Sequence, residues 1–239
     1  MKNFSPGLLP TLITVPVVVI LLALSVWQVN RYVWKVNLVE QINAQLATAP
    51  VSLPAGDIVP EDWQYRRVSV TGVFDHENEL HLFSHADKGR KGFQVITPLR
   101  RSAEGDVVLV NRGWVPEARK EASARAEGLL DGEITLSGIA RKPWAKGWSF
   151  MPQSNPETNV WLYGELQAMG EHIGASVAPV FVEVDASEVP GGFPIGGQTR
   201  VTLPNNHFQY AFTWIGLAIA MIVIFVLYGV KRGRQNGEP

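Results

Sequence analysis

The residue whose position most directly suggests chemistry is His207, which stands where a long apolar stretch begins. Pro204, Asn205 and Asn206 precede it, and an asparagine beside the first turn suits the start of a helix at a membrane surface. An ionisable group at this depth is by default a candidate functional group. A neutral imidazole is also an axial ligand of haem iron, so His207 is a candidate haem ligand.

The helix that His207 would open places Tyr210, Ala211 and Trp214 on the same face, at spacings of three and four residues. Small and aromatic side chains would then border the imidazole, and such a face suits a flat apolar ligand. The same face also suits packing against a partner helix. Spacing alone favours a third interpretation, in which His207 anchors the helix at the membrane interface, and the sequence leaves all three open.

Three further histidines, His76, His81 and His85, lie close together in the sequence and raise the question of a metal site. Side chains on one face of a strand are separated by even numbers of residues, so His81 points away from its two neighbours in the chain. The other two histidines lie outside the regular strand that we predict there. The pattern therefore disfavours a shared metal ion.

Composition excludes several classes of function. The chain has no cysteine, which rules out thiolate metal ligands, thiol redox catalysis and covalent attachment of haem through paired cysteines. Its net charge of -1 offers no electrostatic surface for nucleic acid. The sequence contains none of the motifs of serine hydrolases, zinc proteases or nucleotide-binding enzymes, so we expect a protein that is not an enzyme.

Two stretches without charge are long enough to cross a membrane, because about 20 apolar residues span the hydrocarbon core. They lie between Lys2 and Arg31 and between Arg200 and Lys231. The first stretch could alternatively be a cleaved signal peptide. However, its apolar run is longer than the apolar core of a signal peptide, and only one basic side chain precedes the run, which favours an uncleaved anchor. We predict transmembrane helices over 8–30 and 205–230, a juxtamembrane amphipathic helix over 31–49, a soluble domain over 50–203 and a basic tail over 231–239.

Basic residues beside the two stretches indicate their orientation. The tail 231–239 carries a lysine and two arginines, whereas only Arg200 lies shortly before the second stretch. Both termini are then expected in the cytoplasm and the soluble domain in the periplasm, although Arg31 and Lys35 after the first stretch weaken this prediction. A mitochondrial transit peptide would be rich in arginine, so we predict a multi-pass protein of a bacterial inner membrane.

Between the two stretches the apolar pattern changes to a period of two, which indicates strands. We predict a mainly β (α+β) domain, a small antiparallel sheet or barrel with one or two helices, in which the first two strands form a hairpin. The loop over 142–156 contains Trp144, Trp148 and Phe150, and we expect it to be ordered because such large side chains must be covered. The predicted strands are 65–74, 79–84, 92–101, 106–115, 134–140, 160–163 and 180–185, and the predicted helices are 117–127 and 165–173.

Several short blocks, taken in order along the chain, resemble a known family. The segment from Asn205 to Trp214, Asn-Asn-His-Phe-Gln-Tyr-Ala-Phe-Thr-Trp, resembles the signature that opens the second membrane span of the surfeit locus protein 1 family, the assembly factors of haem-copper terminal oxidases. The other blocks are Trp27-Gln28 with Arg31 and Lys35, Tyr65-Arg66-Arg67-Val68 with Gly72 and Phe74, Gly92-Phe93 with Thr97-Pro98-Leu99, and Val110 to Pro116. Their order between two terminal spans makes the resemblance specific, and we expect a bacterial member of this family.

The resemblance implies a function that composition does not show. It implies an assembly factor for haem-copper cytochrome c oxidase that sits in membrane lipid, binds haem a and assists its insertion into oxidase subunit I. Haem A synthase, which makes this haem, is a further expected partner. The resemblance makes His207 the proposed ligand of the haem iron, to which we add Tyr210 and Trp214 as neighbours of the ring and Arg200 or Arg31 as partners of the haem propionates.

A second class of function fits the same resemblance. The protein could be a scaffold that never holds haem and only stabilises subunit I, with His207 anchoring its helix or contacting the partner. A copper chaperone is disfavoured, because cysteine is absent and the four methionines do not cluster. The sequence assigns no role to Arg112 and Trp114, and a strand-end turn that requires Gly113 is the simplest account of that block.

Overall fold

A computed structural model describes residues 4–85, 89–103, 105–199 and 204–235 of the chain. The chain divides into two compact units, one made of its two ends, Met1–Gln41 with Val201–Pro239, and the other of Ile42–Arg200. We refer to them as the helix unit and the barrel unit. The α-helices are α1 (Leu8–Leu46), α2 (Pro60–Trp63), α3 (Leu166–His172) and α4 (His207–Gln235).

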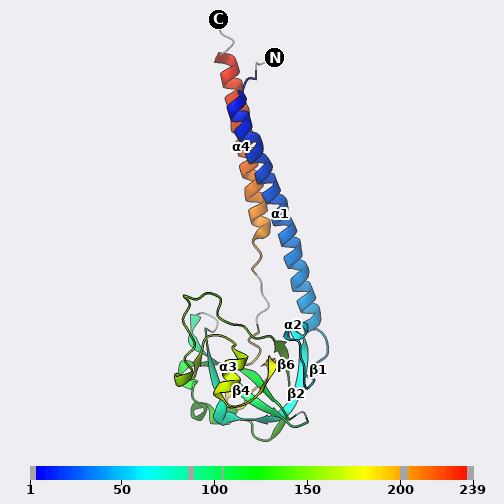
Figure 1. Cartoon of the computed structure of the whole chain (residues 1–239), viewed down its shortest axis with the longest axis vertical. Helices are drawn as coiled ribbons and strands as arrows, with labels where there is room; N and C mark the ends of the chain where they lie inside the picture. The colour runs from blue at the N-terminus through cyan, green and yellow to red at the C-terminus, as the bar shows by residue number, and fades with distance from the viewer. Residues whose placement is uncertain (1–3, 86–88, 104, 200–203, 236–239) are drawn as a thin grey trace. The chain divides into compact units, whose positions relative to one another are not determined.

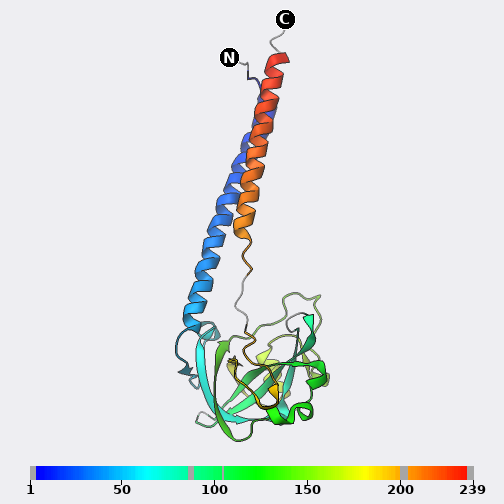
Figure 2. The ribbon, with the colours of Figure 1, turned by 180° about the vertical axis from the view of Figure 1, so that it is seen from behind.

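The helix unit consists of α1 and α4, which run side by side in opposite directions (Figures 1 and 2). The N-terminal end of α1 is fixed to the C-terminal half of α4 by a hydrogen bond from Ser5 N to Gly229 O of 3.1 Å and by ring contact between Phe4 and Phe225. Both helices are long and apolar enough to cross a membrane, with a mean hydropathy of 2.5 and 2.4. Only 6% and 11% of the residues in their most apolar stretches are buried in the structure, so most of these side chains face outward, unlike those of a soluble core helix. Helix α1 continues past residue 30 without a break.

The barrel unit is built around a closed ring of strands. Strand β2 pairs with β6 on one side and with β4 on the other, which closes the ring in the order β2, β6, β8, β5, β4. The remaining strands extend it, β1 beside β2, β3 beside β4 and β7 beside β3. This confirms the prediction of a small, mainly β barrel with a few helices, and Figure 2 shows the strands curving around their common interior. The strands are β1 (Val51–Ser52), β2 (Arg67–Phe74), β3 (Leu80–His85), β4 (Lys91–Arg101), β5 (Val107–Pro116), β6 (Glu133–Arg141), β7 (Val160–Trp161) and β8 (Val177–Val184).

Most neighbouring strands are antiparallel, but β5 and β8 run parallel, as do the short pairs β1–β2 and β3–β7. A parallel pair needs a long crossover between its strands. Between β5 and β8 the chain supplies it with β6, β7 and α3. The last strand of the barrel is therefore placed between β5 and β6, which precede it in the chain.

Strand β5 carries hydrophobic side chains into two cores, because successive side chains point to opposite faces. Val108 and Val110 belong to the cluster that includes Val68 and Val180, whereas Leu109 belongs to the cluster that includes Met169 of α3. All six are fully buried. The first cluster fills the barrel, and the second lies under α3 on the other face of β5.

The predicted hairpin between the first two strands is wrong. Among the described residues β2 does not pair with β3, and both pair with β4 instead, as the registers Phe74↔Leu99 and Leu80↔Ile96 show. A short 3-10 turn, η1 (His76–Asn78), separates the two strands. Strand β4 runs from Lys91 to Arg101 and is long enough to accept both along one edge.

The predicted helix over 117–127 is also corrected. This segment forms two 3-10 pieces, η3 (Glu117–Arg119) and η4 (Ala122–Gly128), and Arg125 inside the second has a non-helical backbone. The reason is the side chain of Arg125, which is buried in an ion pair with Glu79. Two further 3-10 turns are η5 (Pro156–Thr158) and η6 (Pro190–Gly192).

The loop over 142–156 differs from expectation at its tip. Trp144 packs against Phe181, with ring centroids 5.4 Å apart. Trp148 and Phe150 are not covered, and they remain 69% and 82% exposed in the described structure. The expectation that all three large side chains are covered is therefore wrong for two of them.

Candidate functional site

His207 is held in place by a glutamine of the other long helix. Its Nδ1 lies 2.7 Å from Oε1 of Gln28, a residue 179 positions earlier in the chain. An amide oxygen only accepts hydrogen bonds, so Nδ1 is the donor in this pair, and Nε2 of the neutral imidazole then keeps its lone pair. Among the described residues no hydrogen bond is made to Nε2. Gln28 itself is nearly buried, with 9% exposure, so the pair is fixed by packing as well.

The segment that leads into α4 is also tied to α1. Lys35 Nζ donates a hydrogen bond to the carbonyl oxygen of Pro204, and Asn205 Nδ2 donates to the carbonyl oxygen of Tyr32 at 3.4 Å. The rings of Tyr32 and Phe208 lie 5.3 Å apart. These contacts fix the start of α4 against residues 28–35 of α1, so His207 stands in a defined position.

The predicted ring neighbours of His207 occupy different positions on α4. Ala211 is buried, and its carbonyl oxygen accepts a hydrogen bond of 3.1 Å from Ser25 Oγ of α1. Trp214 is partly buried, and its indole Nε1 is buried without a hydrogen-bond partner among the described residues. Tyr210 is 53% exposed and lies at the margin of this face.

Of the two arginines proposed as partners of the haem propionates, the structure describes only Arg31. Arg200 lies outside the described residues. Arg31 stacks on the ring of Trp34 in its own helix, with the guanidinium carbon 4.0 Å from the ring centroid. A cation over an aromatic ring is held by electrostatic attraction, so Arg31 is already engaged.

These side chains fit an iron-binding role in one respect. A histidine that ligates a metal usually donates its other ring N–H to an acceptor that fixes the tautomer and the ring orientation. Gln28 is such an acceptor for His207. Sequence reasoning quoted Gln28 only as part of a family block, and a polar residue inside an apolar helix was the signal that could have identified it.

A second buried polar cluster lies in the barrel unit, around the carboxylate of Glu79. Arg125 Nη2 pairs with Glu79 Oε2, Arg112 Nη1 lies 3.4 Å from Oε1, and Thr97 Oγ1 donates to Oε1 at 3.1 Å. Arg112 Nη2 also donates to the carbonyl oxygen of Gly128. The cluster thus fastens the segment 117–128 to the barrel, and this gives Arg112 a structural role that the sequence did not assign.

The pKa values of Glu79 and Arg112 keep these two groups charged at neutral pH. Burial raises the pKa of Glu79, but the hydrogen bond and charge of Arg125, with the charge of Arg112 and the hydrogen bond from Thr97, outweigh it and leave that pKa below 4.5. Burial lowers the pKa of Arg112 to about 10, against the charge of Glu79, which raises it. At neutral pH the carboxylate and both guanidinium groups are charged, so this is an ion-pair network rather than a proton donor.

The three histidines His76, His81 and His85 have separate surroundings. His76 Nε2 bonds to the carbonyl oxygen of Leu130 at 3.0 Å, and His81 is buried against Phe93 with both ring nitrogens unpartnered among the described residues. Burial lowers the pKa of His81. His85 is exposed. No group of three or more potential metal ligands occurs in the described part of the chain.

At Gly113 the backbone of β5 lies very close to the backbone of Ile195. Gly113 has a φ of +121°, and a Cβ there would lie 2.0 Å from the carbonyl oxygen of Ile195. Trp114 and Ile195 exchange two backbone hydrogen bonds of 2.9 Å. Only glycine fits this conformation and this distance, so the expected need for glycine is confirmed. The expected strand-end turn is wrong, because Gly113 lies inside β5 and pairs with Val95 of β4. Trp114 is buried, and its role is to hold the segment around Ile195 to the barrel.

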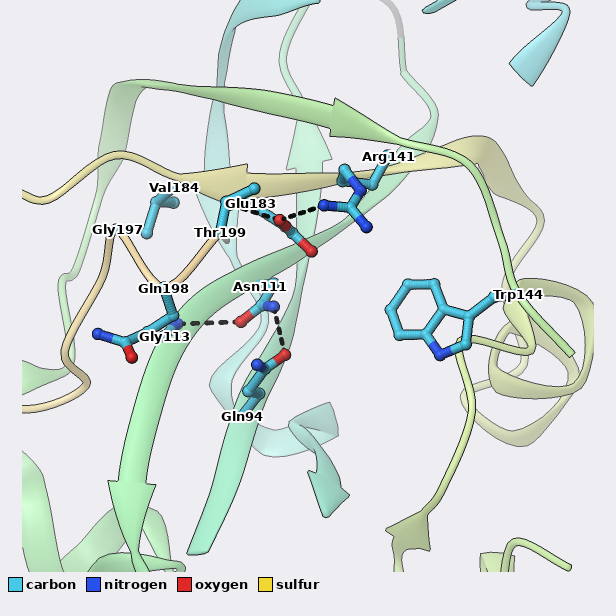
Figure 3. Close-up of a pocket in the computed structure, with 10 residues that line it drawn as sticks. All are labelled: Gln94, Asn111, Gly113, Arg141, Trp144, Glu183, Val184, Gly197, Gln198 and Thr199. Carbon is cyan, nitrogen blue, oxygen red and sulfur yellow. Dashed lines mark hydrogen bonds and ion pairs between the residues drawn. The ribbon is translucent and has the colours of Figure 1, made fainter. Parts of the chain in front are cut away.

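A small polar pocket of about 220 Å³ opens between β4, β5, β8 and the segment 197–199 (Figure 3). On one side Arg141 Nη1 lies 3.5 Å from Glu183 Oε2, which also accepts a hydrogen bond from Thr199 Oγ1. Below them Asn111 Nδ2 donates to Gln94 Oε1 at 2.8 Å, and the ring of Trp144 lies across the pocket. Most of these polar groups are paired with one another, so the pocket presents few free donors to a ligand.

Comparison with known proteins gives the relationship of the whole chain. The family model described as "SURF1 family" matches residues 15–219. Surfeit locus protein 1 of Homo sapiens is 38% identical over 213 residues, covering 82% of this chain and 70% of that protein. The SURF1-like protein of Monosiga brevicollis is 36% identical over 242 residues, covering 97% of this chain and 91% of that protein. The SURF1-like protein of Drosophila melanogaster is 37% identical over 229 residues, covering 87% and 74%.

These relatives are eukaryotic, so the bacterial origin of this chain stays a prediction. The match extends from α1 across the barrel into α4. It therefore includes Gln28 and His207 as well as the cluster around Glu79. On the extent of this match and the identity to its relatives, the chain belongs to the SURF1 family.

Proposed function

We propose that this chain is a membrane-anchored, non-catalytic assembly factor for haem-copper cytochrome c oxidase, which holds haem a through His207 and assists its insertion into oxidase subunit I. Family membership is consistent with oxidase assembly. The single observation that carries the haem-binding part is the pairing of His207 Nδ1 with Gln28 Oε1 at 2.7 Å. It leaves Nε2 as the nitrogen available to iron and orients the imidazole before any ligand arrives.

In this proposal haem a is cargo, and the residues of this chain hold and orient it. His207 supplies the iron ligand, and Gln28 keeps its ring in one tautomer. Trp214 lies two helical turns after His207 on α4, with an indole N–H that is unpartnered in the described structure. Tyr210 lies one turn after His207 and offers an exposed ring, and Arg200 is the proposed partner of a propionate. Arg31 could take that role only by leaving Trp34.

The proposed location follows from the two apolar helices. We infer that α1 and α4 cross a bacterial inner membrane, with the barrel unit in the periplasm and both termini in the cytoplasm. The basic residues Arg232 and Arg234 in the last turn of α4 support this orientation. Oxidase subunit I, haem A synthase and the surrounding lipid are then the expected partners.

A scaffold that binds no haem is the second candidate, and the same hydrogen bond favours it. A bond between polar side chains of two membrane helices stabilises their association by about 0.6 kcal/mol on average. Gln28 and His207 could have this role alone, together with Ser25 and the carbonyl oxygen of Ala211. In that case subunit I would recognise the exposed surface of the protein.

The experiment that separates the two candidates is an optical spectrum of the detergent-purified protein, produced together with the enzymes that make haem a. We expect the Soret and α bands of haem a in the unchanged chain and their loss in His207→Ala. The matched control is His172→Ala, because His172 is an exposed histidine at the end of α3. This control should keep both bands.

Two outcomes would contradict haem binding through His207. The first is a folded, membrane-extracted protein that carries no haem signal, which would leave the scaffold. The second is an unchanged haem spectrum in His207→Ala. Thermal unfolding of each variant shows whether a lost band reflects lost ligation or lost folding.

A further inference from the structure

The most exposed large apolar side chains of the described barrel unit are both in one short loop. Trp148 is 69% exposed and Phe150 is 82% exposed, whereas the next, Val59, is 54% exposed. Their rings stack on each other, with centroids 6.3 Å apart and planes inclined by 25°. Large rings are normally buried or covered by a partner surface. We call the turn that carries these two rings the tip, and its exposure indicates contact with something other than the barrel unit.

The loop that carries the tip is ordered, because contacts with the barrel fix both of its ends. Trp144 donates its backbone N–H to Gly164 O at 3.1 Å, and its ring packs against Phe181. On the other side Tyr163 Oη donates to the carbonyl oxygen of Pro152 at 3.0 Å. A turn closed by Met151 N–H and Trp148 O, 3.1 Å apart, lies between them. The two rings therefore protrude from a folded turn.

The charge of the loop has one sign. Residues 142–156 include two lysines and no aspartate or glutamate. Lys142 lies 3.6 Å from Glu61 at the base of the loop, and Lys146 stands close to the two rings in the sequence. Tryptophan at the level of lipid headgroups, with basic residues beside it, is the usual composition of an interfacial membrane anchor.

The size of the tip distinguishes a lipid surface from a protein partner. Two aromatic side chains present about 150–250 Å² each, which is well below the roughly 800 Å² that each partner buries in a stable protein interface. The two rings line none of the five main pockets in the described part of the chain. A convex tip of this area suits insertion between lipid headgroups better than docking on a folded surface.

We propose that the turn carrying Trp148 and Phe150 inserts into the headgroup region of the bilayer and that Lys146 strengthens its attraction to anionic lipid. The inference rests on the proposed location of α1 and α4 across a membrane. The chain passes from the helix unit into the barrel unit after Gln41 and returns to the helix unit at Val201. Because of this covalent connection, insertion does not have to overcome the cost of bringing a free protein to the membrane.

The test uses the absence of cysteine in the chain. Phe150→Cys in the full-length protein gives a single site for an environment-sensitive fluorophore, and the protein is reconstituted into nanodiscs of phosphatidylcholine with phosphatidylglycerol. We expect blue-shifted emission that is quenched by spin-labelled lipid and protected from aqueous iodide. The matched control is Ser102→Cys, at an exposed turn between β4 and β5, and its label should be quenched by iodide alone.

One further variant and one change of lipid composition test the parts of the proposal. Trp148→Ser in the Phe150→Cys background should reduce quenching by lipid severalfold while leaving the thermal unfolding of the protein unchanged, because both side chains are exposed. Replacing phosphatidylglycerol by phosphatidylcholine should reduce the quenching by lipid less than Trp148→Ser does, since the charge of Lys146 supplies only part of the attraction.

The proposal is overturned if the label at residue 150 is quenched by iodide in nanodiscs, or if the label at residue 102 is quenched by lipid equally well. A label that is protected only after oxidase subunit I is added would also overturn it and would assign the tip to a protein partner. Failure of the chain to enter nanodiscs at all would count against the proposed location of the helices, which is a different result from an exposed tip in a correctly reconstituted protein.

Discussion

Arg112 and Glu79 are both buried in the barrel unit, and Arg112 Nη1 lies 3.4 Å from Glu79 Oε1. Arg125 pairs with the other oxygen of the same carboxylate. One buried carboxylate thus balances two buried guanidinium groups, and backbone carbonyl oxygens such as that of Gly128 take the remaining donors. The relationship gives a structural role to an arginine to which the sequence assigned none.

Removal of this carboxylate should destabilise the barrel unit strongly. Glu79→Gln leaves two buried guanidinium groups without a counter-charge, and breaking a buried ion pair in this way costs about 3–5 kcal/mol. Chemical denaturation of the detergent-solubilised chain measures the loss. Glu77→Gln is the matched control, because Glu77 is exposed two residues away, and it should stay within about 0.5 kcal/mol. Equal effects of the two substitutions would contradict the role assigned to Glu79.

The same carboxylate should make the barrel sensitive to acid. The pKa of Glu79 in the folded protein lies below its ordinary value of 4.5, so its contribution to stability is complete above about pH 4.5 and is lost as the pH falls through the folded pKa. The free energy of unfolding should therefore fall as the pH is lowered below about 4.5, and it should fall less steeply in Glu79→Gln. Parallel pH profiles for the two proteins would show that Glu79 is not responsible.

Gly113 should not tolerate a side chain. Gly113→Ala would combine a positive φ of +121° with a Cβ 2.0 Å from Ile195 O, and a strained backbone plus a clash should cost about 3 kcal/mol or more. Thermal unfolding measures the effect. The control Gly147→Ala places a Cβ 3.9 Å from the nearest atom, Met151 Sδ, and should leave the unfolding temperature unchanged. A small loss at Gly113 would mean that the segment around Ile195 shifts easily.

Gln28 should tune haem binding without being a ligand. If His207 binds iron as proposed, Gln28→Leu removes the acceptor of its Nδ1 proton, and loss of such a partner costs about 10–100-fold in metal affinity. Titration of the purified protein with haem a measures this change. Gln209→Leu, an exposed glutamine on α4, is the matched control. An unchanged affinity in Gln28→Leu would separate the helix contact from haem binding.

Local patterns in the sequence predicted the elements of the fold well. Charge-free stretches predicted α1 and α4, and the alternation of apolar residues predicted most strands to within a few positions. Periodicity reports which face of an element is buried. It does not report which strand lies beside it, and this is why β2 and β3 were paired with each other rather than each with β4.

Contacts between distant residues account for the other differences. The segment 117–127 has helix-forming composition, but Arg125 departs from helical geometry where its side chain reaches Glu79. The sequence singled out His207, yet its partner Gln28 is brought to it only by the antiparallel packing of α1 and α4. Trp148 and Phe150 were expected to be covered because large apolar side chains usually are. Composition does not show which of these side chains a fold leaves exposed.

The position of β8 has a consequence for synthesis of the protein. Strand β8 lies between β5 and β6, so the ring cannot close until Val184 has left the ribosome, and the earlier strands wait with two unpaired edges. Helix α4 begins shortly afterwards, at His207. Exposed strand edges in a partly made chain are prone to wrong pairing. Closure of the barrel and emergence of the last helix therefore fall in the same late interval of translation, when the nascent chain is most vulnerable to aggregation.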